Sequence, residues 1–86
     1  MICGQIIYID RFGTCVTNIR SESVKPGDHA LRVGRRTVPV LSYSGTTGNN
    51  GALCAPGQHG YLELSVPGGS AERVFALKLG STVSLS

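Results

Sequence analysis

The stretch YIDRFGTCVTNI, residues 8–19, joins two strand-like segments through a tight turn. The apolar run at residues 6–9 ends at Asp10, and Gly13 closes the turn. Residues 14–19 then alternate in the way that is typical of a half-buried strand. This stretch therefore predicts a β-hairpin.

Two roles fit Asp10 in that hairpin. An aspartate shortly before a glycine commonly opens an Asx turn, in which its carboxylate accepts hydrogen bonds from backbone N–H groups, here those around Phe12. A carboxylate held at the end of a strand can also bind a cation or a protonated amine. The two roles are compatible, because a carboxylate fixed by a turn is already oriented for a ligand.

Short strand-like segments separated by turn formers continue along the chain. We expect two strands joined at Gly34, with Pro39 favouring an edge position for the second. Residues 61–66 show the clearest alternation, and Ser70 is expected to cap a single helical turn at residues 71–77. The other expectations are a strand at 2–9 with Gly4 as a bulge, strands at 30–33 and 37–43, an apolar segment at 52–56, a last strand at 82–86, a loop at 20–29 and a mobile loop at 44–51.

Length and composition indicate one small all-β domain over residues 1–86. The chain is 41% hydrophobic, and its 12 glycines and four prolines separate short β-branched runs. A chain of this length can bury one modest core. We expect about six or seven short strands and one helical turn, arranged as a compact antiparallel barrel or sandwich.

Charge and cysteine content say little about which molecules or metals the protein could bind. Eight Lys and Arg against five Asp and Glu give a net charge of +3, which weakly favours anionic partners. The tight basic group is Arg32, Arg35 and Arg36. The three cysteines lack metal-site spacing, so we expect no metal and reduced thiols in a cytoplasmic protein. No apolar run approaches the roughly 18 residues of a membrane-spanning helix, so no membrane partner is expected.

The spacing of polar residues predicts no catalytic centre. His29 and His59 lie in expected loops without a carboxylate nearby in sequence. The chain contains neither a GxSxG nucleophile motif nor a glycine-rich phosphate loop. The residues alone therefore favour a protein that is not an enzyme.

Two segments resemble one known domain. YIDRFGTCVTNI resembles the YIDRFGNLVTNI-type motif that opens the C-terminal domain of the S-adenosylmethionine (SAM) hydrolases, or SAM hydroxide adenosyltransferases, relatives of the fluorinating and chlorinating enzymes. GYLELSVPGGSAERVFALKLGSTVSL, residues 60–85, is similar to the closing GYLEIAVNQGSAAELLGLKVGDPV pattern of that domain. The resemblance covers nearly all of this chain but about the last third of the family's. It implies a small antiparallel, Greek-key-like β-barrel.

The resemblance also implies a ligand site. Proteins of the family are homotrimers that hold SAM between the large N-terminal domain of one subunit and the small C-terminal domain of its neighbour. Asp10 matches the aspartate that binds the amino group of the methionine moiety, and Phe12 matches a phenylalanine that borders the nucleoside. Thr14 replaces an asparagine that hydrogen-bonds the adenine, and a hydroxyl lacks the paired donor and acceptor of an amide.

The second segment departs further from the family pattern. Gln58 and His59 replace a serine and a variable residue. With Asp10, Phe12 and Thr14, the resemblance implies His59 and Gly68 as ligand-binding residues. Pro67 and Gly68 replace the pair whose backbone reads the adenine edge, and Pro67 has no N–H to donate. Compared with the family motifs, this sequence thus keeps the residues that form the fold better than the residues that contact the ligand.

Three hypotheses follow. The first is a non-catalytic stand-alone barrel that forms a homo-oligomer and retains residual binding of SAM or adenosine. The second is an accessory subunit of a split SAM hydrolase, completed by a separately encoded N-terminal-domain-like subunit. The third, and least favoured, is a nucleic-acid-binding barrel that uses the three arginines with Tyr43 or Tyr61 as stacking platforms.

Overall fold

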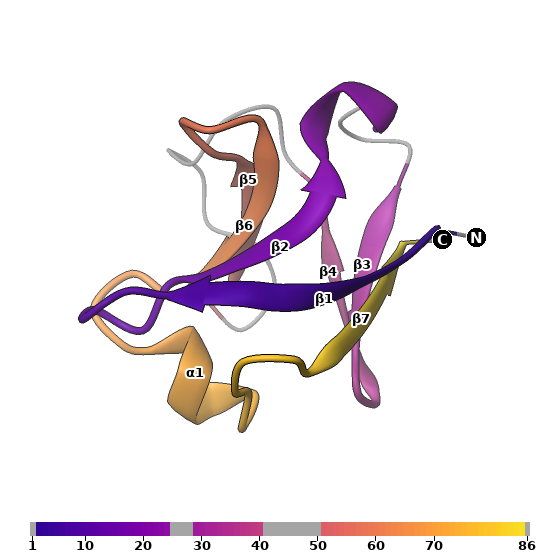
Figure 1. Ribbon diagram of the computed structural model, residues 1–86. Coiled ribbons are helices and arrows are strands. Elements are labelled where there is room, and N and C mark those ends of the chain that lie inside the picture. Colours follow the sequence, from indigo (N-terminus) through magenta and orange to yellow (C-terminus); the bar gives the residue numbers. More distant parts are fainter. Residues whose placement is uncertain (1, 25–28, 41–50, 86) are drawn as a thin grey trace.

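The computed structural model describes residues 2–24, 29–40 and 51–85 (Figure 1). Within these ranges the chain forms seven strands, one 3-10 turn and one short helix. Their bounds are β1 Ile2–Ile9, β2 Cys15–Arg20, η1 Ser21–Ser23, β3 Ala30–Val33, β4 Arg36–Pro39, β5 Leu53–Pro56, β6 Tyr61–Ser65, α1 Ala71–Val74 and β7 Thr82–Leu85. The expected strand end at 41–43, most of the expected loop at 44–51, and residues 25–28 lie outside the described residues.

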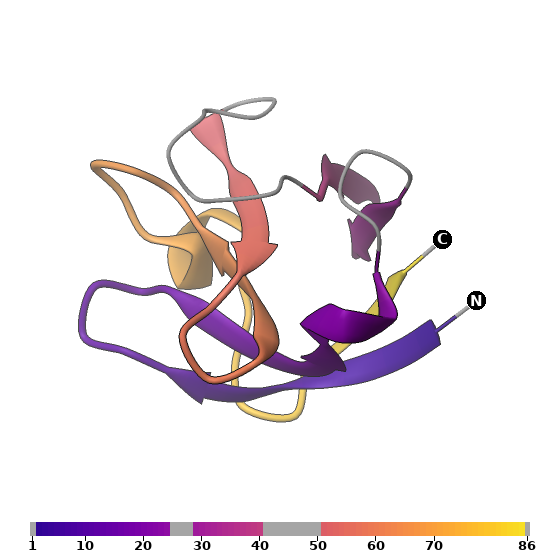
Figure 2. The same cartoon turned by 90° about the horizontal axis from the view of Figure 1, so that it is seen from above.

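The strands form one antiparallel sheet that curls into a nearly closed barrel (Figure 2). The strand order is β4-β3-β7-β1-β2-β6-β5, and a parallel bridge between Val40, which directly follows β4, and Cys54 of β5 links the two ends of this order. Since β7 lies between β1 and β3, the chain path is Greek-key-like and not up-and-down. The expected all-β barrel is confirmed, and the sandwich alternative is wrong.

The core is formed by the side chains that point into the barrel from alternate positions along the strands. In β6, Leu62 and Leu64 are fully buried while Glu63 and Ser65 on the other face are partly exposed. Full burial of such a leucine side chain contributes about 1.5–3 kcal/mol. The largest fully buried side chains are Ile6, Leu31, Leu62, Leu64, Leu85, Val38, Val40, Val83, Thr17, Cys15 and Cys54.

The predicted hairpin is confirmed, but its bulge is not at Gly4. Gly4 keeps an unbroken register with Val83 of β7, and the register against β2 shifts between Ile6 and Tyr8. A Cβ atom at Gly4 would lie 2.6 Å from Asn18 Oδ1. The bulge prediction was wrong because the missing side chain at Gly4 allows a close approach of β2 and leaves the pairing of Gly4 with β7 intact.

A buried hydroxyl forms hydrogen bonds with backbone groups where the pairing between β2 and β6 is irregular. The register of these strands shifts between Val16 and Arg20. Thr17, which is fully buried in this interval, donates its Oγ1 proton to the Leu62 carbonyl at 2.9 Å and accepts from the Ile19 N–H at 3.1 Å. The hydroxyl therefore satisfies backbone groups that regular pairing would otherwise satisfy.

The other local predictions agree in part with the residues that the structure describes. The expected loop at 20–29 is wrong at its start, because Arg20 ends β2 and η1 follows it; β4 begins one residue earlier than expected, and α1 ends at Val74 and not at 77. The turn between β3 and β4 contains Gly34 at φ +62°, and β4 lies at one end of the strand order, as Pro39 indicates. Ser70 caps α1 by accepting a hydrogen bond from the Arg73 N–H at 3.3 Å. The helix ends after one turn, followed by Ala76 in the left-handed region at φ 52°.

Candidate functional site

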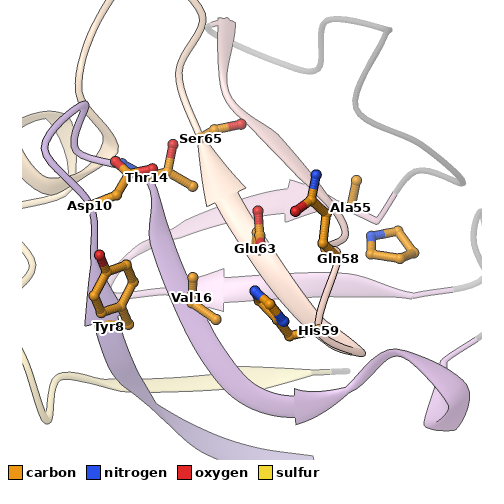
Figure 3. A pocket seen from close by; sticks show the side chains of 11 residues that line it. Tyr8, Asp10, Thr14, Val16, Ala55, Gln58, His59, Glu63 and Ser65 are labelled. Atoms are coloured by element: carbon orange, nitrogen blue, oxygen red, sulfur yellow. The ribbon is translucent and has the colours of Figure 1, made fainter.

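A groove of about 520 Å³ crosses the outer face of β2 and β6 (Figure 3). It begins beside the turn that follows β1 and ends at the turn between β5 and β6. We call it the polar groove. Its lining residues are Tyr8, Asp10, Thr14, Val16, Ala55, Pro56, Gly57, Gln58, His59, Glu63 and Ser65.

Asp10 is held at the rim of the polar groove by its own turn. Its Oδ1 accepts hydrogen bonds from the backbone N–H groups of Phe12 at 2.8 Å and Thr14 at 3.0 Å. The Asp10 carbonyl also accepts from the Gly13 N–H at 3.0 Å. The predicted Asx turn is confirmed. Because both side-chain bonds fall on Oδ1, and no donor in the described parts of the chain bonds to Oδ2, the second oxygen is available to a ligand.

The Asp10 turn rests directly on the start of α1. Gly13 has φ +85°, and its carbonyl accepts a hydrogen bond from the Glu72 N–H at 3.0 Å. The space that a side chain at Gly13 would occupy is filled by Ser70, whose Cα would lie 2.9 Å from the added Cβ. The helix that Ser70 caps therefore fixes the position of the carboxylate.

A second hollow of about 620 Å³ adjoins the polar groove, since both are lined by Thr14 and Ser65. We call it the Phe12 hollow. Its lining residues are Phe12, Thr14, Leu53, Ser65, Val66, Pro67, Gly68 and Gly69. The Phe12 ring is 66% exposed, with the Arg11 guanidinium 5.0 Å from its centroid.

Pro67 and Gly68 form a turn at the edge of the Phe12 hollow. The Gly69 N–H donates to the Val66 carbonyl at 2.9 Å, and Gly68 has φ +76°. This is the arrangement of a type II turn, which favours proline at its second position and glycine at its third. The replacement at Pro67 is thus compatible with the fold, while it removes one backbone donor from the rim of the hollow.

The structure brings all five residues implied by the resemblance to these two connected hollows. Asp10, Thr14 and His59 line the polar groove, and Phe12, Thr14 and Gly68 line the Phe12 hollow.

Sequence reasoning missed Tyr8, Glu63 and Ser65 as groove residues. The alternation of residues 61–66 was the signal that could have found two of them, because it places Glu63 and Ser65 together on the face opposite Leu62 and Leu64.

The cysteines near the site are not poised as nucleophiles. Burial raises the pKa of the Cys15 thiol to about 11, with the carboxylates of Glu72 and Asp10 adding to the effect. Burial alone raises the pKa of the Cys54 thiol to about 12. Cys3 is exposed, and none of the three cysteines forms a disulfide. In the ranges 2–24, 29–40 and 51–85 no group of three His, Cys, Asp or Glu side chains could hold a metal ion.

The basic group lies apart from the polar groove. Arg32, Arg35 and Arg36 surround the β3–β4 turn, and the Arg36 guanidinium lies 5.5 Å from the centroid of the Phe75 ring. Tyr61 stands on β6, with Arg20 at 5.8 Å from its ring centroid. The structure therefore does not bring Tyr61 to the three arginines, and Tyr43 is outside the described residues. None of the described helices is long and apolar enough to cross a membrane.

Comparison with known proteins gives the family of this chain. The model of the SAM hydroxide adenosyltransferase C-terminal domain matches residues 4–84. This chain belongs to that family. The chain is 33% identical, over 82 residues, to the (R)-S-adenosyl-L-methionine hydrolase of Thermus thermophilus, and the match covers 95% of this chain and 31% of the relative.

Two solved structures share the fold of this domain. A conserved hypothetical protein from Thermus thermophilus has a TM-score of 0.82 and 31% identity, with all of this chain and 33% of the other covered. An uncharacterized conserved protein from Thermotoga maritima has a TM-score of 0.75 and 29% identity, with coverage of 96% and 35%. The domain thus spans about a third of the length of the relatives that it matches.

Proposed function

We propose that this domain binds a SAM- or adenosine-type ligand across the polar groove and the Phe12 hollow and does not itself catalyse a reaction. The observation that carries the proposal is the Asp10 carboxylate at the rim of the polar groove: two backbone N–H groups orient one of its oxygens, and no donor in the described residues bonds to the other. A charge-assisted hydrogen bond from a ligand ammonium to such a carboxylate is stronger than one between neutral groups.

The Phe12 hollow suits the nucleoside part of the ligand. The exposed Phe12 ring offers an apolar surface for a base, and Thr14 lies where the two hollows meet. A threonine hydroxyl makes fewer directed bonds to adenine than an amide does. The adenine part should accordingly be held more weakly here than by a domain with asparagine at that position.

Hydrolysis of SAM would need more than this domain. The domain corresponds to less than a third of the Thermus hydrolase. We propose that the remaining part of such a protein, on the same or on a separately encoded chain, would supply the reactive groups, with this domain contributing the Asp10 side of the site. Addition of a separately produced N-terminal domain of a relative should then give SAM hydrolysis that Asp10→Asn lowers.

We further propose that the domain self-associates through the apolar surface beside the Asp10 turn. Ile7 is 46% exposed and Leu79 is 66% exposed, and they line a common hollow with Tyr8. Contact with a second copy would remove this apolar area from water. Light scattering should give a mass above that of one chain, and Leu79→Ser should lower it, whereas Val74→Ser, on the exposed side of α1, should not. A monomeric mass for the unmodified domain would contradict this proposal.

Isothermal titration calorimetry tests the ligand proposal directly. SAM, adenosine and methionine are titrated into the domain, its Asp10→Asn variant and the control Glu22→Gln, whose carboxylate is exposed and paired with Arg20 at 3.7 Å. Asparagine also forms Asx turns, so Asp10→Asn removes the charge and keeps the hairpin. We expect SAM binding to be lost in Asp10→Asn and unchanged in Glu22→Gln. Absence of heat with all three ligands would overturn the proposal.

A further inference from the structure

The Phe12 hollow offers a nucleobase very few groups that have a fixed hydrogen-bonding role. None of its eight lining residues is charged, and none has an amide side chain. Its polar side chains are the hydroxyls of Thr14 and Ser65. Recognition of a base in this hollow therefore depends on these two hydroxyls and on the backbone.

The two hydroxyls lie next to each other on the outer face of neighbouring strands. The register of β2 and β6 pairs Cys15 with Leu64, and at the next position it places Thr14 opposite Ser65. Since Cys15 and Leu64 are fully buried, the residues beside them point outward, as Figure 3 shows. Facing side chains of an antiparallel pair have Cβ atoms about 4.5–5.5 Å apart, so one base can contact both hydroxyls. Neither hydroxyl forms a hydrogen bond within the described ranges.

The backbone donors on the Asp10 side of the hollow are already engaged. The N–H groups of Phe12 and Thr14 both donate to Asp10 Oδ1, at 2.8 Å and 3.0 Å. The turn that orients the carboxylate therefore withdraws these two donors from a base. What Phe12 offers is its exposed ring, and stacking on an aromatic ring tolerates every base, because each base has a π-face.

The turn on the opposite side of the hollow offers one backbone donor at its tip. Pro67 has no N–H, and the Gly69 N–H donates to the Val66 carbonyl at 2.9 Å. The Gly68 N–H forms no hydrogen bond with the residues that the structure describes. A single donor suits N7, an acceptor that adenine and guanine share, so it does not separate the two bases.

Adenine and the 6-oxo purines differ in the group next to N7. Adenine presents the N6 amino donor there, whereas guanine presents the O6 acceptor. An amide side chain can pair with N6 and N7 of adenine together, which favours that base. A hydroxyl rotates to donate or to accept, so Thr14 and Ser65 can bond to either group.

We propose that the Phe12 hollow binds purine nucleosides in general, with inosine and guanosine held about as tightly as adenosine. This inference rests on the proposed function and names the base part of its ligand. Thr14 is the specificity-determining residue, because its side chain lies where the two hollows meet. The positions of Thr14, Ser65 and Pro67 carry asparagine, alanine and asparagine in the family motifs, so the tolerance belongs to this sequence.

The test titrates adenosine, inosine and guanosine into the domain by calorimetry at neutral pH, with SAM as the reference ligand. Adenosine and inosine differ only in the group at position 6 of the purine. We expect the three dissociation constants to agree within about threefold, less than one bidentate amide contact would produce. Thermal melts of each variant below establish that the barrel is retained.

Thr14→Asn introduces an amide at the meeting point of the two hollows. It should raise the preference for adenosine over inosine to about fivefold or more. The control Thr37→Asn makes the same chemical change at an exposed position of β4, which lines neither hollow, and should leave the ratio unchanged.

The outcomes separate this inference from the proposed function. If the unmodified domain prefers adenosine by more than about threefold, the tolerance is overturned and the proposed function stands, since a backbone carbonyl would then read the amino group. An unchanged ratio in Thr14→Asn would overturn the role of Thr14. Heat from SAM but from no nucleoside would show that the hollow does not hold the base, and would overturn the inference alone. If none of the four ligands binds, the proposed function fails and the inference fails with it.

Discussion

Replacement of Gly13 by alanine should destabilise the domain far more than a glycine-to-alanine change usually does. Gly13 adopts φ +85°, a region that costs a residue with a side chain about 1–2 kcal/mol. The added methyl group would also overlap Ser70, including its backbone Cα at 2.9 Å. Because backbone atoms must move to make room, overpacking adds about 1–3 kcal/mol. We expect a total loss of about 3 kcal/mol.

The matched control is Gly34→Ala. Gly34 also has a positive φ, of +62°, but a Cβ there would meet no atom within 4 Å. It should lose only the conformational part, about 1 kcal/mol. The difference between the two variants isolates the contact between the Asp10 turn and the start of α1.

Urea unfolding followed by circular dichroism provides the assay. For a domain of this size the slope is about 1 kcal/mol per molar urea, so the midpoint should fall by about 3 M for Gly13→Ala and about 1 M for Gly34→Ala. Equal shifts for the two variants would refute the argument that the turn and the helix cap are in tight contact.

Two further predictions concern the core. Thr17→Val keeps the shape of the side chain but leaves the Ile19 N–H and the Leu62 carbonyl without their partner, so we expect the free energy of unfolding to fall by about 1–3 kcal/mol in the same assay. A fall of less than about 0.5 kcal/mol, the range of ordinary surface substitutions, would contradict this expectation. The raised pKa values of Cys15 and Cys54, about 11 and about 12 against an ordinary 9.0, mean that above pH 9 the unfolded chain loses thiol protons that the folded chain keeps. Stability should therefore fall as pH rises from 9 to 11, by about 1.4 kcal/mol per pH unit for each thiol, and Cys54→Ala should remove one of the two contributions; an identical slope in that variant would show that the buried thiol is not responsible.

The hairpin and the strand pattern could be predicted because their signals are local. The apolar run before Asp10, Gly13 in the turn and the alternation at residues 61–66 each depend on neighbours in sequence. The same holds for the Ser70 cap, which involves a backbone group three residues away. The choice between barrel and sandwich depended on the pairing of β1 with β7, which joins opposite ends of the chain and leaves no local pattern.

The polar groove could be predicted only in part for the same reason. Asp10, Phe12 and Thr14 form one short segment, which the resemblance covers. Glu63 becomes a groove residue only because β6 pairs with β2 and because Gly57, on the turn that precedes β6, lacks a side chain. Gly4 was misread because a strand glycine serves equally for a bulge or for a close approach, and the partner that decides between them, Asn18, lies on another strand.

The pairing of β1 with β7 also determines where a tag or a second domain fused to either end of the chain would lie. Ile2 and Leu85 are direct partners, so both ends of the described chain emerge side by side, at the opposite end of β1 from Asp10 (Figure 1). Eight residues of extended strand separate Ile2 from the Asp10 turn, a distance of about 26 Å. An affinity tag or reporter fused at either end would leave the groove uncovered. A domain fused ahead of Ile2 would need a linker of about eight extended residues to reach the groove, whereas a neighbouring molecule could approach it directly.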